Sequence, residues 1–374
     1  MAMRERREIV QLWQQGGSSV LATLVRVEGS SYRQSGARLL LRGGGEYAGT
    51  ISGGCLETEI LRKAEWLVRN GAVMERYSTL FDDSAEVPFG LGCGGAIDVL
   101  FEPAETPECR ALMEALENTL RGHERTILTF LPAKERKMAR AVFDGRGDVL
   151  FVSKGWSESS AQYARKCAVH SLEPSQDKFF FEQLVGPPRL FVLGAGDDAK
   201  PLVSMAALMG WSVTVMDGRA QLAKAERFPS AQHVSVIRTP SDSLREIQSD
   251  DAVVIMTHSY EQDRELLASL LPRRPKYLGV LGARHRSSLL IAEAVARLGC
   301  SVEGCCEQIS APVGLDLGGE GPDAIALAVI AEIQACHAGR LKNVRSLSAE
   351  DVARHVLEGG ASRYLRTYCA RDVS

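Results

Sequence analysis

The chain lacks any apolar run that approaches the roughly 20 residues needed to span a bilayer. It also lacks the pattern of a secretory signal. The basic residues Arg4, Arg6 and Arg7 are followed by the segment 9–13, which is too short and too polar for the apolar core of a signal peptide. We therefore expect a cytoplasmic protein with no membrane partner.

An excess of positive charge is missing as well. The formal net charge of −3 at pH 7 argues against a general nucleic-acid-binding protein. No Cys-x-x-Cys pair and no zinc-finger spacing occur, and we expect no metal site. The nine cysteines are an odd number in a long chain, which argues against a disulfide scaffold. For Cys300, Cys305 and Cys306 we expect core packing, with metal binding as the alternative.

The chain is long enough for two domains, because 374 residues exceed what one hydrophobic core usually supports. We predict an α/β protein. An N-terminal α+β domain spans residues 1–180, a C-terminal Rossmann-like domain with a doubly wound parallel sheet spans 187–345, and a tail spans 346–374. The weakly periodic segment 157–188, which closes on Gly-Pro-Pro, is the expected linker.

The apolar spacing also predicts the individual elements. In the first half we expect helices over residues 3–15, 56–70 and 106–121, and strands over 19–27, 37–41, 47–51, 96–101, 126–131, 141–143 and 149–152. In the second half we expect strands over 190–193, 213–216, 233–237, 252–256 and 277–281, alternating with helices, and a helix over 322–337. Short apolar strands that alternate with helices are typical of a parallel sheet.

Two cysteines lie inside glycine turns, and we take both as candidate catalytic thiols. Cys55 precedes a helical pattern, and the dipole at a helix N-terminus favours a thiolate. Cys93 lies in a turn before a strand. Flanking glycines let the backbone approach a ligand closely, which makes them candidate cofactor-binding residues: Gly53, Gly54, Gly94 and Gly95. The alternative is that each thiol is buried beneath a tight turn.

Glu57 follows the first of these turns. We expect it to be a surface acid that complements the dipole of the helix, with proton transfer beside Cys55 as the alternative.

The second half begins with a dinucleotide-type strand, turn and helix. Gly194 and Gly196 belong to a Gly-x-Gly-x-x-Ala turn, and Asp217 ends the next strand, where a ribose-binding acid belongs. Asp197 and Asp198 lie in the same turn and would repel a pyrophosphate. The alternative is therefore a plain strand-to-helix connection in which Asp198 is an N-cap.

Basic residues follow the fourth and fifth strands of this half. Ligands of open α/β sheets bind beyond the carboxyl ends of the strands, and we expect His258 and Arg284 in that crevice, where they could hold an anion. His285 and Arg286 follow Arg284. The alternatives are that His258 caps the next helix and that the arginines are solvated or paired.

Several segments resemble one family. Residues 27–31, 49–57 and 93–95 resemble the XdhC/CoxI family of xanthine dehydrogenase accessory proteins. Residues 193–196, 210–215, 281–284 and 311–316 resemble the Rossmann-like C-terminal domain of that family. The likeness covers roughly residues 5–340, in the same order, and leaves the tail without a motif.

The resemblance implies a maturation factor for molybdenum hydroxylases that does not itself turn over a metabolite. It would bind molybdenum cofactor, support exchange of an oxo for a sulfido ligand, and deliver the cofactor to an apo molybdenum hydroxylase. Cys55 or Cys93 would hold the metal end or take part in sulfur delivery, and the crevice at Gly194, Gly196 and Arg284 would hold the phosphate or dinucleotide end. A cysteine desulfurase and a second copy of the chain are further candidate partners.

Two other functions remain open. An NAD(P)-dependent oxidoreductase would use Asp217 for the ribose and His258 as proton donor, but it leaves the thiol turns unexplained and lacks a Tyr-x-x-x-Lys pair. A scaffold that only docks partner proteins explains the two domains but not the glycine-flanked thiols.

Overall fold

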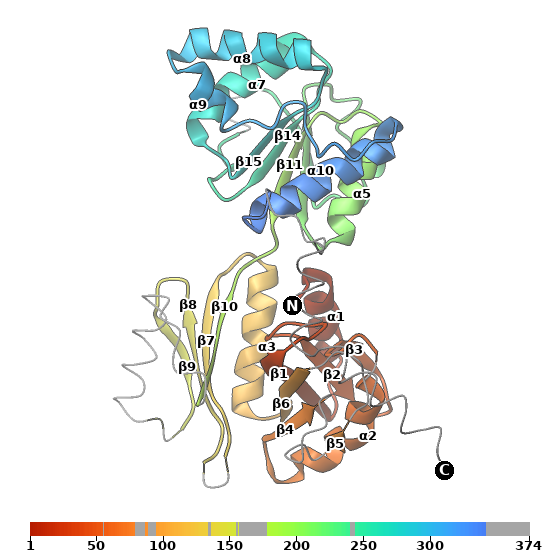
Figure 1. Cartoon of the computed structure of the whole chain (residues 1–374), viewed down its shortest axis with the longest axis vertical. Helices are drawn as coiled ribbons and strands as arrows, with labels where there is room; N and C mark the ends of the chain where they lie inside the picture. Colours follow the sequence, from red (N-terminus) through yellow and green to blue (C-terminus); the bar gives the residue numbers. More distant parts are fainter. Residues whose placement is uncertain are drawn as a thin grey trace, which may run out of the picture.

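The computed structural model describes residues 1–54, 56–78, 87–88, 95–133, 136–154, 156, 178–239 and 244–341. These residues form two halves joined end to end (Figure 1). The predicted tail over 346–374 lies outside them. In the described part of the chain, no helix combines the length and apolar character that a bilayer crossing requires.

The N-terminal half is built on two sheets. Its helices are α1 (Met3–Gln14), α2 (Glu57–Leu67) and α3 (Pro107–Leu120), and its strands are β1 (Ser19–Gly29), β2 (Arg38–Arg42), β3 (Tyr47–Gly49), β4 (Val73–Ser78), β5 (Val87–Pro88), β6 (Gly95–Pro103), β7 (Arg125–Phe130), β8 (Ala139–Asp144), β9 (Val149–Val152) and β10 (Phe179–Leu184). One sheet has the order β3-β2-β1-β6-β4-β5 and the other β10-β7-β8-β9. The mixture of helices and largely antiparallel strands confirms the predicted α+β half.

The central strand β1 is apolar along most of its length because helices cover both of its faces. Leu21 and its neighbour Leu40 pack in one core with residues of α1 and α3. Val20 and Leu24, on the opposite face, pack in a second core with residues of α2. The side chains of a strand alternate between its faces, and this explains why a continuous apolar run serves two cores.

A buried ion pair joins the two sheets. Arg140 on β8 is 1% exposed and donates to both carboxylate oxygens of the fully buried Glu102 on β6, at 2.8 and 2.9 Å. The same guanidinium also donates to the Thr129 hydroxyl and to the Glu108 carbonyl. A buried charge is tolerated when its hydrogen bonds are satisfied, and these contacts fix the two sheets against each other.

Strand β10 corrects the C-terminal part of the linker predicted over 157–188, whereas residues 157–177 lie outside the described part of the chain. Residues 179–184 pair antiparallel with β7 along the whole strand, and the first half therefore continues beyond the predicted boundary at 180. Residues 185–188 then lead directly into the next sheet.

The C-terminal half is a parallel sheet with helices on both faces, as predicted. It contains β11 (Arg189–Leu193), α5 (Ala199–Leu208), β12 (Ser212–Asp217), β13 (His233–Val236), β14 (Ala252–Ile255), α7 (Tyr260–Leu270), β15 (Tyr277–Val280), α8 (Arg284–Leu298), α9 (Val302–Cys306) and α10 (Gly321–His337). The sheet order is β13-β12-β11-β14-β15, with all neighbouring strands parallel. Helices α5 and α10 cover one face, and α7 and α8 cover the other.

This strand order places a topological switch point between β11 and β14, because the chain leaves β11 to one side and returns to β14 on the other. In doubly wound sheets the crevice beyond the carboxyl ends of the strands at that point is the usual ligand site.

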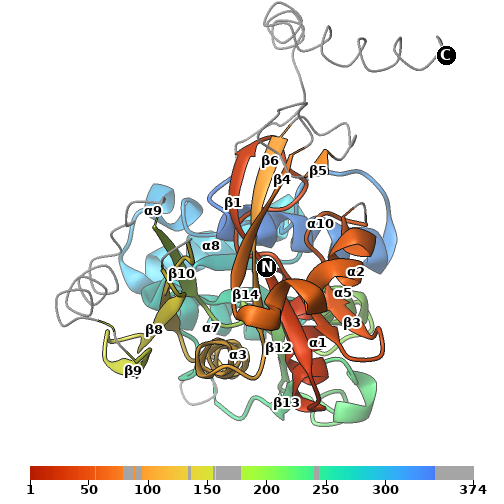
Figure 2. The ribbon, with the colours of Figure 1, turned by 90° about the horizontal axis from the view of Figure 1, so that it is seen from below.

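The two halves meet at the opposite edge of the parallel sheet. Arg7 on α1 donates to the Gly210 carbonyl at 3.3 Å, and a Cβ at Gly210 would lie 2.6 Å from that of Met3. Gly210 lies between α5 and the amino end of β12. Figures 1 and 2 show α1 beneath this edge, and the switch-point crevice therefore faces away from the N-terminal half.

Candidate functional site

The loop before α2 is organised by one buried carboxylate. Glu57 begins α2 and has 6% of its surface exposed. Its Oε1 accepts hydrogen bonds from the Thr50 hydroxyl and from the backbone N–H groups of Ile51 and Ser52, at 2.6 to 2.9 Å. Its Oε2 accepts from the Ser52 hydroxyl at 2.6 Å and from the Gly54 N–H at 2.8 Å. The carboxylate thus occupies the donors that such a turn could offer to an anion.

The environment of Glu57 keeps it ionised. Burial alone would raise its pKa, but the hydrogen bonds from Ser52 and Thr50 outweigh burial and lower the pKa from 4.5 to about 2. The expectation of a surface acid is therefore wrong. Glu57 supports the loop from inside, and at neutral pH its carboxylate has no proton to give. In the sequence, only the hydroxyl residues Thr50 and Ser52 indicate that the Glu57 carboxylate could accept hydrogen bonds from this loop.

Both glycine–cysteine loops reach one short segment. The β1–β6 pairing extends to Gly29 and Gly95, and a Cβ at Gly95 would lie 2.2 Å from the Ser30 carbonyl oxygen. The Tyr32 ring lies over Gly53, where a Cβ would be 2.8 Å from the ring. Ser30 and Tyr32 are two residues apart, which limits their Cα separation to about 7.6 Å. The described ends of the two loops therefore converge on residues 30–32.

The thiols of these loops are not among the described residues. Cys55, Cys93 and Gly94 all lie outside them, and their roles stay predictions. Gly54, next to Cys55, is exposed and has a φ of +121°, a conformation that favours glycine.

In the C-terminal half, internal contacts account for the glycine turn after β11. Gly194 has a φ of +131°, and a Cβ there would lie 2.2 Å from the Met256 carbonyl oxygen. The Ala195 N–H donates to Asp217 Oδ2 at 2.7 Å. Gly194 is thus required by the close approach of β14, and the Ala195 amide is already paired within the protein.

Asp217 is at the end of β12, as predicted, but it is fully buried. Besides Ala195, it accepts hydrogen bonds from the backbone N–H, Nε and Nη2 of Arg219, at 2.8 to 2.9 Å. Burial alone would raise the pKa of Asp217, but the bonds from Arg219 and Ala195 lower it. Both carboxylate oxygens are engaged, and ribose binding by Asp217 stays a prediction that would require these contacts to be exchanged.

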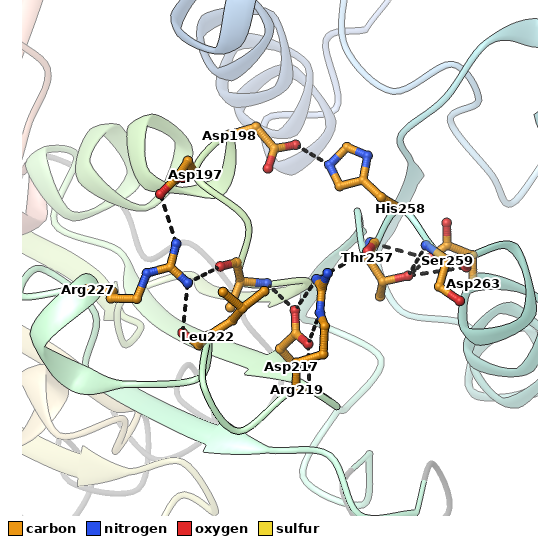
Figure 3. Close-up of polar contacts among 11 residues, drawn as sticks. Asp197, Asp198, Asp217, Arg219, Leu222, Arg227, Thr257, His258, Ser259 and Asp263 are labelled. Atoms are coloured by element: carbon orange, nitrogen blue, oxygen red, sulfur yellow. Dashed lines mark hydrogen bonds and ion pairs between the residues drawn. The ribbon is translucent and has the colours of Figure 1, made fainter.

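The two acidic residues of the turn each have a basic partner (Figure 3). Asp197 accepts from Arg227 at 2.8 Å and pairs with Lys200 at 2.7 Å, and these contacts lower its pKa. Asp198 Oδ2 lies 2.7 Å from Nε2 of His258, and it does not cap α5 with its side chain. The repulsion expected from two free carboxylates is therefore reduced. Asp198 occupies the N-cap position of α5, as the alternative predicts, but its side chain makes no capping hydrogen bond.

His258 reaches across the switch point from the loop after β14. Its φ of +64° places it in the left-handed region, which is uncommon for a residue with a side chain. Ser259, not His258, caps α7, since its hydroxyl accepts from the Gln262 N–H. His258 thus lies beside the turn after β11, and its role in ligand binding stays a prediction, whereas the capping alternative is wrong. Gly196 lies beneath the pair: a Cβ there would be 2.3 Å from Asp198 Oδ1.

Arg284 begins α8 and is exposed. Among the described residues its guanidinium has no hydrogen-bond or ion-pair partner, whereas Arg286 donates to the buried Asp263 at 2.7 Å. A small hollow of about 10 Å³ lies beside Asp198, lined by apolar residues that include Met256 and Val313. It has room for about one water molecule and is too small for a larger ligand.

Known proteins match both halves of this arrangement. The model of the XdhC and CoxI family matches residues 12–78, and the model of the XdhC Rossmann domain matches residues 190–333. A Bacillus subtilis protein named as a probable subunit of xanthine dehydrogenase is 30% identical over 84% of this chain and 92% of its own length. The chain belongs to the XdhC and CoxI family. This confirms the resemblance stated from the sequence and the Rossmann-like fold of the second half.

A second curated protein and a crystal structure are also similar to this member of the XdhC and CoxI family. The molybdenum cofactor insertion chaperone PaoD of Escherichia coli is 24% identical over 87% of the chain and 86% of its own length. A crystal structure of a xanthine dehydrogenase from Bacillus halodurans has a TM-score of 0.76 and 27% identity, and the match covers 94% of this chain and 99% of that one. The first family segment contains the Glu57 loop, and the second contains the crevice.

Proposed function

We propose that this protein is an accessory factor for molybdenum hydroxylases, which binds molybdenum cofactor as cargo, supports its sulfuration and delivers it to the apo-enzyme. The names of its relatives support this role: one is named as part of a xanthine dehydrogenase and another as a molybdenum cofactor insertion chaperone. Family membership over both halves supports a common role for the whole chain.

The convergence of both glycine–cysteine loops on residues 30–32 is the observation that carries the proposal. Cys55 follows Gly54 directly, and Cys93 precedes Gly95 by two residues. Thiols next in sequence to these loop ends would suit the molybdenum end of the cofactor or the transfer of sulfur to it. Glu57 holds the first loop through hydrogen bonds from within the chain, which supports a preformed position for this loop.

We assign the anionic end of the cofactor to the switch-point crevice. There Arg284 supplies a positive charge that has no partner among the described residues. The pairing of Asp197 and Asp198 with basic side chains favours this assignment. An NAD(P)-dependent oxidoreductase is less well supported, because Asp217 and the Ala195 N–H, two groups that such a site would use, already bond to each other.

The test is retention of the cofactor by the purified protein, measured as fluorescence of its oxidised pterin after gel filtration, together with activation of an apo molybdenum hydroxylase. We expect the Cys55→Ala, Cys93→Ala double variant to lose roughly tenfold or more in both measurements, which for retention corresponds to about 1.4 kcal/mol of binding free energy. Cys306→Ala, which removes an exposed thiol elsewhere, is the matched control.

Normal retention and activation by the double variant would contradict the thiol assignment. Tight binding of NADH, with no pterin retained, would support the oxidoreductase instead.

A further inference from the structure

Two thiols outside the proposed cofactor site face each other where α8 meets α9. The Sγ atoms of Cys300 and Cys305 lie 3.0 Å apart. Local capping fixes this geometry: α8 ends at Gly299 in the left-handed conformation, and the Ser301 hydroxyl accepts from the Gly304 N–H to begin α9. The chain thereby folds back and brings the first turn of α9 under Cys300. The expectation of core packing is correct for Cys305 and wrong for Cys300 and Cys306, which are both exposed.

The two thiols differ in access. Cys305 is 2% exposed, whereas Cys300 is open to solvent. Burial, together with the hydrogen bond to Cys300, raises the pKa of Cys305 to about 11. A dissolved oxidant therefore meets Cys300 first, and Cys305 is the thiol placed to react with the product.

We propose that Cys300 and Cys305 are a modification site at which a peroxide produces a reversible disulfide. A disulfide needs a sulfur separation of about 2.05 Å, and the pair can reach it by a movement of about 1 Å in the exposed Cys300 side chain. The bond would tether the start of α9 to the end of α8.

The chemistry balances with hydrogen peroxide as the oxidant. The Cys300 sulfur attacks one peroxide oxygen, the O–O bond breaks, and the departing hydroxide takes the thiol proton to become water, which leaves a sulfenic acid. The Cys305 sulfur then attacks that of Cys300. The S–O bond breaks, and hydroxide departs with the Cys305 proton as a second water. Two electrons pass from the thiol pair to the peroxide, and a dithiol reductant reverses the change.

The experiment maps the bond in the full-length protein after treatment with hydrogen peroxide. Trypsin releases residues 298–340 as one peptide, which contains Cys300, Cys305, Cys306 and Cys336. We expect oxidation to halve the number of cysteines that iodoacetamide can alkylate in this peptide, and a reductant to restore it. Cleavage after Glu303, between Cys300 and Cys305, should leave two fragments joined only in the oxidised sample.

Variants identify the partners. Cys306→Ser, at an exposed neighbour, should oxidise like the wild type, whereas Cys300→Ser and Cys305→Ser should form no bond within this peptide. Cys300→Ser changes an exposed side chain and therefore tests the proposal without disturbing the core. An oxidised wild type that keeps every thiol alkylatable would overturn the proposal, as would a bond that forms equally well in Cys305→Ser through Cys306.

Discussion

At the scale of single residues, Glu57 is the side chain with the clearest consequence. It accepts five hydrogen bonds from the loop that precedes α2. A glutamine of the same shape would place an NH₂ group against these donors and leave several of them unsatisfied. Buried donors that lose their acceptor cost about 1–3 kcal/mol each.

We expect Glu57→Gln to lower the free energy of unfolding by roughly 3 kcal/mol at pH 7, measured by urea denaturation. Glu65→Gln, an exposed change on the same helix, is the control and should have little effect. Equal free energies of unfolding for the two variants would show that the hydrogen bonds of Glu57 make no net contribution to stability.

The pKa of Glu57 adds a pH dependence. The folded state lowers this pKa from 4.5 to about 2, and the carboxylate is therefore favoured by folding. Its contribution, roughly 3 kcal/mol at about 1.4 kcal/mol per unit, is fully present above pH 5. It is lost as the pH falls from about 4.5 towards 2. The stability difference between the wild type and Glu57→Gln should shrink over that window, and a constant difference would contradict the shift.

At the scale of elements, the two glycines of the turn between β11 and α5 have different roles. A Cβ at Gly194 would meet backbone atoms of Met256, which cannot move without displacing β14. A Cβ at Gly196 would meet only the carboxylate of Asp198, which can rotate away. Gly194 thus allows the close packing of β11 against the end of β14, and Gly196 leaves space for the Asp198 carboxylate beside His258.

We expect Gly194→Ala to cost about 3 kcal/mol of folding stability and Gly196→Ala less than about 1 kcal/mol, both measured by urea denaturation. Gly196→Ala should instead separate Asp198 from His258, which the chemical shifts of the histidine ring can report. Two variants of equal stability would contradict the distinction.

The sequence predicts the parallel sheet well because its strands are continuous apolar runs, each covered on both faces. It does not predict β10. That strand carries Glu182 and Gln183 beside its phenylalanines, and Glu182 is acceptable there because it pairs with Arg38, at 2.5 Å and 144 residues away. The sequence predicts correctly that Asp217 ends a strand. It does not predict that Ala195 and Arg219 donate hydrogen bonds to this carboxylate, because those contacts depend on the folded positions of the two residues.

At the scale of the whole molecule, the crevice and the glycine–cysteine loops do not face each other within one chain. The N-terminal half contacts the amino edge of the parallel sheet at Gly210, while the crevice lies at the carboxyl edge. The five residues of β11 separate these edges by about 16 Å. A single chain therefore presents the two proposed sites on different sides, and the two ends assigned above would belong to one cofactor only if two chains combine.

A double-mutant cycle tests this separation. In binding of molybdenum cofactor, the effects of Cys55→Ala and Arg284→Ala should add to within about 0.5 kcal/mol, as they do for independent sites. A coupling above about 1 kcal/mol would mean that one cofactor contacts both residues. Two chains would then have to combine the loops of one with the crevice of the other, and mixtures of the two single variants should regain binding.

Under the proposed function, the Glu57 carboxylate also affects the release of the cofactor. The hydrogen bonds to Glu57 order residues 50–54 from within the chain, and this order would not change when a cofactor binds or leaves. The protein therefore invests little conformational entropy in either event. Affinity then depends on the few atoms that touch the cargo, and a competing site on the recipient enzyme can capture it without first unfolding the donor.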